Sequence, residues 1–167
     1  MSAEPRIALL LAEIDQGRSV MERIAAFYRE QAARWGTIES RTTEQAIVLA
    51  DVLVTFYTCL ETVFVRISQH FENSLAREKW HRELLDRMSL EVPGIRARAI
   101  GPATRELLDE LLRFRHFKRY YFEFHYDWDR LEFVRRKFEQ ALPLLSADLD
   151  RFAAFLRELS NRGEAET

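Results

Sequence analysis

The 167-residue sequence contains little of what cross-links or interrupts a small fold: one cysteine, four prolines and five glycines. A single cysteine, Cys59, cannot build a disulfide framework or a zinc cluster within one chain, which favours a reducing cytoplasm. The scarcity of glycine and proline indicates few turns. A formal net charge of −2 excludes a general attraction to nucleic acid, so any RNA-binding surface has to be a local patch.

The sequence also lacks a signal peptide and a long apolar run without charges. Its first ten residues, MSAEPRIALL, have neither a basic start nor a small-residue cleavage site. The longest apolar run, residues 46–67, contains Asp51, Glu61 and Arg66. Three charges in one span predict a buried core helix instead of a membrane helix. We therefore expect no association with a membrane.

Apolar residues recur at helical spacing along most of the chain, and no segment alternates as a strand does. Thr42 and Gln45 form a capping-box sequence at the start of the second helix, and Pro143 is expected to end the fifth. The predicted helices cover residues 4–34, 42–71, 80–88, 101–125, 128–142 and 146–159. Residues 92–100 are predicted to form an irregular basic connection, either a lid or a solvated linker. We predict one all-α domain over residues 1–167, an up-and-down helical bundle of five to six helices with a frayed polar tail at 160–167.

The least ordinary stretch is RFRHFKRYYFEFHYDWDR, residues 113–130, in which cationic side chains crowd together and aromatic ones follow. Its first seven residues include Arg113, Arg115, His116, Lys118 and Arg119. On a helical wheel one stripe of this helix is apolar, as a core face should be: Leu107, Leu111, Phe114, Phe117, Tyr121 and Phe124. A second stripe mixes apolar and cationic side chains, with His116 at its margin: Leu108, Leu112, Arg115, Arg119 and Phe122. The mixed stripe predicts a homodimer whose arginines line the cleft between subunits.

These residues suit the chemistry of RNA cleavage. Arg115 and Arg119 lie four residues apart on the same side of a helix, and a phosphate would compensate their repulsion by bidentate hydrogen bonds. His116 can act as general acid or base near neutral pH. The structural alternative is an ion-paired helix surface, in which Glu61 or Asp51 of the apolar run is the internal partner that orients the arginines.

The stretch resembles the signature helix of the HepT-like proteins, a branch of the HEPN superfamily (higher eukaryotes and prokaryotes nucleotide-binding domain). This branch has the motif Phe-Arg-His-x-x-Arg-His-x-Tyr, matched here by Phe114, Arg115, His116 and Arg119, and the segment from Asp127 to Leu131 continues in register. The hexapeptide WHRELL at residues 80–85 is also similar to this branch.

The resemblance implies a dimeric endoribonuclease toxin whose motif helices face each other. It also implies a partner, a minimal nucleotidyltransferase antitoxin that adenylylates the motif tyrosine. By this resemblance Arg115 would bind and polarise the scissile phosphate, His116 would be its polar partner, and Arg119 would add positive charge. Arg113 and Lys118 are the candidate RNA-binding residues beside them.

Two motif positions differ from the pattern: Tyr120 replaces the histidine and Phe122 replaces the tyrosine. Proton transfer could pass to His116, with Tyr120 as a further catalytic candidate, or to His125 in a longer form of the motif. Tyr120 or Tyr121 would then be the adenylylated residue. The alternative is a non-catalytic module that binds RNA or a nucleotidyltransferase, and a third interpretation is a purely structural dimer.

The remaining histidines do not predict a further site. His81, beside Trp80, is interpreted as a surface histidine next to a core tryptophan, and His70 as a partner for the negative end of its helix. Because the four histidines stand in separate contexts, we predict no metal site, and the lack of a glycine-rich phosphate loop argues against a nucleotide hydrolase. We expect no cofactor.

Overall fold

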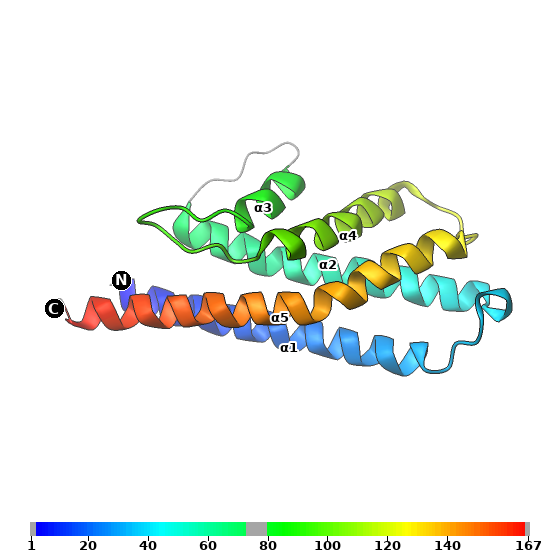
Figure 1. Ribbon diagram of the computed structural model, residues 1–167, viewed down its shortest axis with the longest axis horizontal. Helices are drawn as coiled ribbons and strands as arrows, with labels where there is room; N and C mark the ends of the chain where they lie inside the picture. Colours follow the sequence, from blue (N-terminus) through cyan, green and yellow to red (C-terminus); the bar gives the residue numbers. More distant parts are fainter. Residues whose placement is uncertain (1–2, 73–79, 166–167) are drawn as a thin grey trace.

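The computed structural model describes residues 3–72 and 80–165, and the described residues form helices with no β-strand (Figure 1). The elements are α1 (Ala3–Ala32), a short 3-10 helix η1 (Ile38–Ser40), α2 (Thr43–Phe71), α3 (Trp80–Met88), α4 (Pro102–Tyr120) and α5 (Trp128–Ala165). Helices α1, α2, α4 and α5 run alternately up and down, and the short α3 packs on α2 and α4. The predicted all-α bundle of five to six helices is confirmed.

Helix α2 forms the centre of the core, since it contacts each of the other four helices. It begins with the predicted capping box, in which Thr42 accepts a hydrogen bond from the Gln45 amide and the Gln45 side chain accepts one from the Thr42 amide. It is also the one described helix that is long and apolar enough to cross a membrane. Its apolar residues are nevertheless buried against the other helices, as in the core helix of a bundle.

Helix α4 ends at Tyr120 and not near His125, so this predicted boundary was wrong. Tyr121 is extended, with φ −100° and ψ 106°, and its hydroxyl donates to the carbonyl of His125. The chain has reached the end of the bundle here and must reverse into α5. Phe124, placed in the core stripe by its spacing, is consequently 60% exposed. The Asp127 side chain then accepts a hydrogen bond from the backbone amide of Asp129 at 2.9 Å and caps the start of α5.

Helix α5 continues through Pro143 to Ala165, so the prediction that this proline separates two helices was also wrong. A proline inside a helix costs roughly 3 kcal/mol because a backbone hydrogen bond is lost and the ring crowds the preceding turn. The burial of one continuous apolar face offsets that cost: Phe138, Ala141, Leu145, Leu149, Phe152 and Leu156. Figure 1 shows α5 bending along its length, and an internal proline is the usual cause of such a bend.

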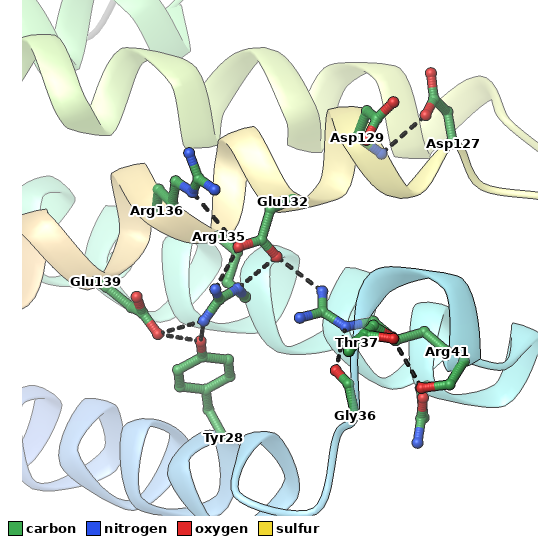
Figure 2. A network of polar contacts seen from close by, with 12 residues as sticks. Tyr28, Gly36, Thr37, Arg41, Asp127, Asp129, Glu132, Arg135, Arg136 and Glu139 are labelled. Atoms are coloured by element: carbon green, nitrogen blue, oxygen red, sulfur yellow. Dashed lines mark hydrogen bonds and ion pairs between the residues drawn. The ribbon is translucent and has the colours of Figure 1, made fainter.

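A polar network joins α1 and the segment after it to α5 (Figure 2). Glu132 of α5 binds Arg135 on its own helix and Arg41 at the end of η1, with a distance of 2.8 Å from Arg41 Nη1 to Glu132 Oε2. Arg135 also donates to the hydroxyl of Tyr28 at 2.9 Å. The Arg135 hydrogen bond, followed by that of Arg41, lowers the pKa of Glu132 from 4.5 to about 2.

Stability should therefore depend on the ionisation of Glu132. A pKa depressed in the folded state contributes stability above pH 4.5 that is lost as the pH falls towards 2. Glu132→Gln should lower the free energy of unfolding at pH 7, on the order of 2 kcal/mol, and flatten its dependence on pH between 5 and 2. Urea denaturation across that range measures both effects. An equally steep loss of stability in the variant would show that other carboxylates govern acid unfolding.

Gly17 of α1 packs closely against Val63 of α2. A Cβ atom at this position would lie 2.3 Å from Cγ2 of Val63, far inside van der Waals contact. Glycine costs α1 about 1 kcal/mol in helix propensity relative to alanine, so its presence is explained by packing.

Gly17→Ala should accordingly lower the melting temperature, because forced overpacking costs roughly 1–3 kcal/mol and exceeds the gain in helix propensity. The double variant with Val63→Ala should be more stable than the two single changes predict by simple addition, since the second substitution removes the clash. Thermal unfolding of the four proteins measures this coupling. A stabilised single variant would mean that the two helices separate at little cost.

Candidate functional site

Arg115 projects from α4 towards a buried carboxylate on α2. Its Nη1 atom lies 3.2 Å from Oε1 and 3.3 Å from Oε2 of Glu61, whose side chain is 6% exposed. The expected contact between Arg115 and a carboxylate of the apolar run is therefore present. Asp51, the other candidate, is exposed and has no ion pair among the described residues. Among the residues that the structure describes, the hydrogen bonds of Arg115 all involve Nη1. The rest of its guanidinium is therefore available to an anion.

His81 of α3 completes the surroundings of this carboxylate. Its Nδ1 atom lies 2.7 Å from Oε2 of Glu61 and 3.3 Å from Nη1 of Arg115. A guanidinium needs an acceptor and a carboxylate needs a donor, so Nδ1 can hydrogen-bond only one of them at a time. The contact with Glu61 is the shorter of the two and therefore identifies Nδ1 as a donor. Nδ1 carries a proton and donates it to Glu61, which fixes the tautomer of the ring and leaves Nε2 to exchange protons.

The interpretation of His81 as a surface histidine was wrong. Its side chain is 18% exposed and belongs to an ion-paired site. Neither spacing nor composition could place it there, because its contact with Glu61 depends on how α3 packs across α2. The available signal was the WHRELL segment, which resembles the HepT-like branch. Trp80 stacks on the His81 ring at 3.8 Å between ring centroids and limits how far that ring can turn.

His116 lies next to this group. Its ring centroid is 5.6 Å from that of His81, in an edge-to-face arrangement at 70°. Partial burial lowers the pKa of His116, and the positive charges of protonated His81 and of Arg115 lower it further. His116 therefore stays neutral to a lower pH than a free histidine and is ready to accept a proton. We call Glu61, His81, Arg115 and His116 the Glu61 cluster.

Packing and ion pairs hold α3 in the position that the cluster needs. Leu84, Leu85 and Met88 bury one face of the helix. Arg82 binds Asp109 of α4 at 2.8 Å, and Arg105 of α4 binds Asp86 at 2.9 Å through its Nε atom. In one of these ion pairs α3 supplies the arginine, and in the other α4 supplies it. The two pairs hold α3 against α4 and bring His81 beside Arg115.

Part of the basic segment before α4 is buried, so it is not the solvated linker that was predicted as one alternative. Arg96 is 3% exposed and binds Glu72, while its Nη atoms donate to the carbonyls of Leu90 and Arg87, each at 2.9 Å. Glu72 directly follows α2 and Arg87 lies in the last turn of α3. The buried arginine therefore joins the end of α2 to the end of α3.

The structure spreads the other predicted site residues around the cluster instead of joining them to it. Arg113 pairs with Asp109 at 2.9 Å. Lys118 lies over the ring of Tyr126, and Arg119 lies over the ring of Tyr120. Tyr120 is 72% exposed, and its spacing from His116 puts it one helical turn further along the same side of α4.

The apolar half of the mixed stripe does not face a second subunit, contrary to the prediction from the sequence. Leu108 and Leu112 are fully buried in the core of their own chain, so they are not available to a second subunit. Their burial was missed because α4 packs against three helices, α2, α3 and α5, which widens its core face. The exposed aromatics lie instead at the end of α4 and just after it, where Tyr120, Phe122 and Phe124 are 72%, 85% and 60% exposed.

No group of three or more histidine, cysteine, aspartate or glutamate side chains could hold a metal ion among the residues that the structure describes. The cluster offers instead a fixed guanidinium, two imidazoles and a carboxylate. Such a set can bind an anion and transfer protons.

Comparison with known proteins identifies the family. No curated protein and no solved structure matches the chain. A family model described as HepT-like protein matches residues 48–156, which include α3, α4 and all four residues of the Glu61 cluster. Because this match covers well over half of the chain, the protein belongs to the HepT-like family of the HEPN superfamily.

Proposed function

We propose that this protein is an endoribonuclease toxin of a toxin–antitoxin pair, and that it cleaves cytoplasmic RNA at the Glu61 cluster without a metal ion. Membership of the HepT-like family supports a toxin module of the HEPN type. The observation that carries the proposal is the position of Arg115, a cation fixed by Glu61 beside an imidazole that is neutral near physiological pH. Anion binding and proton abstraction are therefore possible at one place.

The chemistry would use the 2′-hydroxyl of RNA as the nucleophile. His116 accepts the 2′-hydroxyl proton, the oxygen bonds to phosphorus, and the bond to the 5′-oxygen breaks as that oxygen gains a proton. Arg115 binds the non-bridging oxygens and stabilises the charge of the phosphorane, and Arg119 adds positive charge. The products are a 2′,3′-cyclic phosphate and a 5′-hydroxyl. Arg113 and Lys118 would contact neighbouring phosphates, and Tyr120, one turn from His116, could hydrogen-bond the RNA.

One observation favours a second function, the binding of RNA or a nucleotidyltransferase without cleavage. The histidine and tyrosine positions of the family motif are occupied here by Tyr120 and Phe122. Both side chains are exposed, and among the described residues neither forms an ion pair or a hydrogen bond with the Glu61 cluster. A protein that only binds would retain Arg115 for phosphate and would need no acid or base.

Cleavage of cellular RNA by the purified protein in excess chelator distinguishes the two functions. The wild type should produce fragments with cyclic phosphate ends, and Arg115→Ala and His116→Ala should each lose about 10²-fold or more in rate. His70→Ala is the matched control, since His70 lies near the end of α2 against Phe71 and outside the cluster. If folded wild-type protein binds RNA but does not cut it, the binding function is correct. Unimpaired cleavage by both cluster variants would place the site elsewhere.

We propose two assemblies, of which the family association with nucleotidyltransferases supports the second. One is a homodimer whose α4 helices face each other, for which the exposed aromatics Tyr120, Phe122 and Phe124 offer a surface. The other is a complex with a cognate minimal nucleotidyltransferase that transfers AMP to a tyrosine. Tyr120 is the better acceptor, because the Tyr121 hydroxyl is already bonded to the carbonyl of His125.

Tyr120→Phe should therefore abolish AMP transfer by the cognate nucleotidyltransferase, whereas Tyr121→Phe should retain it. Intact-mass spectrometry after incubation with ATP and Mg²⁺ measures the modification. Tyr121→Phe also serves as the matched control, since the two positions are adjacent and the substitution is the same. Modification of Tyr121, or of neither tyrosine in a mixture where the two proteins bind each other, would contradict this assignment.

A further inference from the structure

We propose that His81 of α3, held by Glu61, is the general acid that protonates the leaving 5′-oxygen. The proposal rests on the ribonuclease function proposed above and extends it with a catalytic residue from outside the motif helix. It accounts for Tyr120 at the histidine position of the motif. The second proton-transfer group would come from α3 instead of α4.

The first support is the fixed orientation of the His81 ring. Glu61 accepts the Nδ1 proton at 2.7 Å, and Trp80 stacks on the ring at 3.8 Å between centroids. A carboxylate behind a histidine is the usual way to fix its tautomer, and it leaves Nε2 as the atom that gains or loses a proton. Glu61 is a positioning residue in this arrangement, because it acts through His81 and Arg115.

The second support is proximity to the other reactive groups. Glu61 binds both His81 and Arg115, so the imidazole lies next to the cation that would hold the phosphate. The ring centroids of His81 and His116 are 5.6 Å apart, which allows one phosphodiester to contact both rings. His81 retains 18% of its side-chain exposure and can be reached from solvent.

The surrounding charges separate the roles of the two histidines. The charged and titratable groups facing His81 are Glu61 from α2, and Arg115 and His116 from α4. Beyond them, Arg82 is paired with Asp109. The pKa of His116 is lowered by burial first, then by the charge of protonated His81 and by Arg115. His116 is therefore ready to accept a proton, and the acid role falls to His81 because the Glu61 contact at Nδ1 leaves Nε2 facing away from the carboxylate.

His116 and His81 together account for both proton transfers of the reaction. His116 takes the proton of the 2′-hydroxyl as O2′ bonds to phosphorus. The bond from phosphorus to O5′ breaks, and O5′ takes the proton from Nε2 of His81. The cyclic phosphate and the 5′-hydroxyl leave, and the two imidazoles return to their starting states by proton exchange with water.

The test is His81→Asn compared on two substrates with His116→Asn and with the control His70→Asn. Asparagine keeps a donor near the position of Nδ1 for Glu61 but cannot transfer a proton. The first substrate is a dinucleotide with an ordinary 5′-ribose leaving group. The second is a nucleoside 3′-(4-nitrophenyl phosphate), whose leaving group departs without protonation and therefore needs no general acid.

On the dinucleotide, His81→Asn should lose about 10²-fold or more in kcat together with one limb of the pH–rate profile. On the nitrophenyl ester the same variant should stay within about 10-fold of wild type, whereas His116→Asn should remain impaired on both substrates. Activity on the ester also shows that the variant is folded and that its base is intact.

Each other outcome contradicts a different statement. If wild type cleaves neither substrate, the ribonuclease function itself is wrong. If wild type cleaves both and His81→Asn is unimpaired, only the role of His81 is wrong. If His81→Asn loses the same factor in kcat on both substrates, His81 is a structural residue. If His116→Asn loses activity on the dinucleotide alone, His116 is the general acid and His81 the base.

Discussion

The shared carboxylate of Glu61 is the interaction on which the site depends. A buried carboxylate is costly unless it is paired, and Glu61 is paired twice, with His81 of α3 and Arg115 of α4. Each partner is in turn oriented by it, so three helices meet at one charged group. Removal of the carboxylate would leave Arg115 without its internal partner and would free the His81 ring to turn.

Several other arginines of the chain hold the helices together around this site. Arg96 closes the connection between α2 and α3, and Arg82 and Arg105 fasten α3 to α4. Each is matched to a carboxylate, which agrees with the net charge of −2 and with the absence of a broad cationic surface in the sequence. Arg96 and Arg105 bind through several nitrogens, whereas Arg115 contacts its buried carboxylate through Nη1 alone, which leaves the rest of its guanidinium for an anion. The partners of each arginine therefore distinguish those that hold the fold from Arg115, the arginine proposed to bind phosphate.

Local signals in the sequence predicted much of the fold. The capping box at Thr42 and the apolar run of α2 act within a few residues, and the pairing of Arg115 with Glu61 followed from a charge placed in an apolar helix. What failed depended on packing between helices. Pro143 lies inside α5 because a continuous buried face outweighs the local cost, and Leu108 and Leu112 are buried because three other helices pack against α4. His81 was misinterpreted for the same reason, since the register of α3 on α2 is not visible in either segment alone.

The central claim is that an RNA phosphodiester binds at the Glu61 cluster, and the four histidines of the chain provide a direct test. Imidazole ¹H–¹⁵N spectra would be recorded during titration with an RNA oligonucleotide whose 2′-hydroxyls are methylated, which can bind but cannot be cleaved. The account predicts that the resonances of His81 and His116 shift together at saturation and that those of His70 do not. Binding of the oligonucleotide with His81 and His116 unchanged would contradict the account.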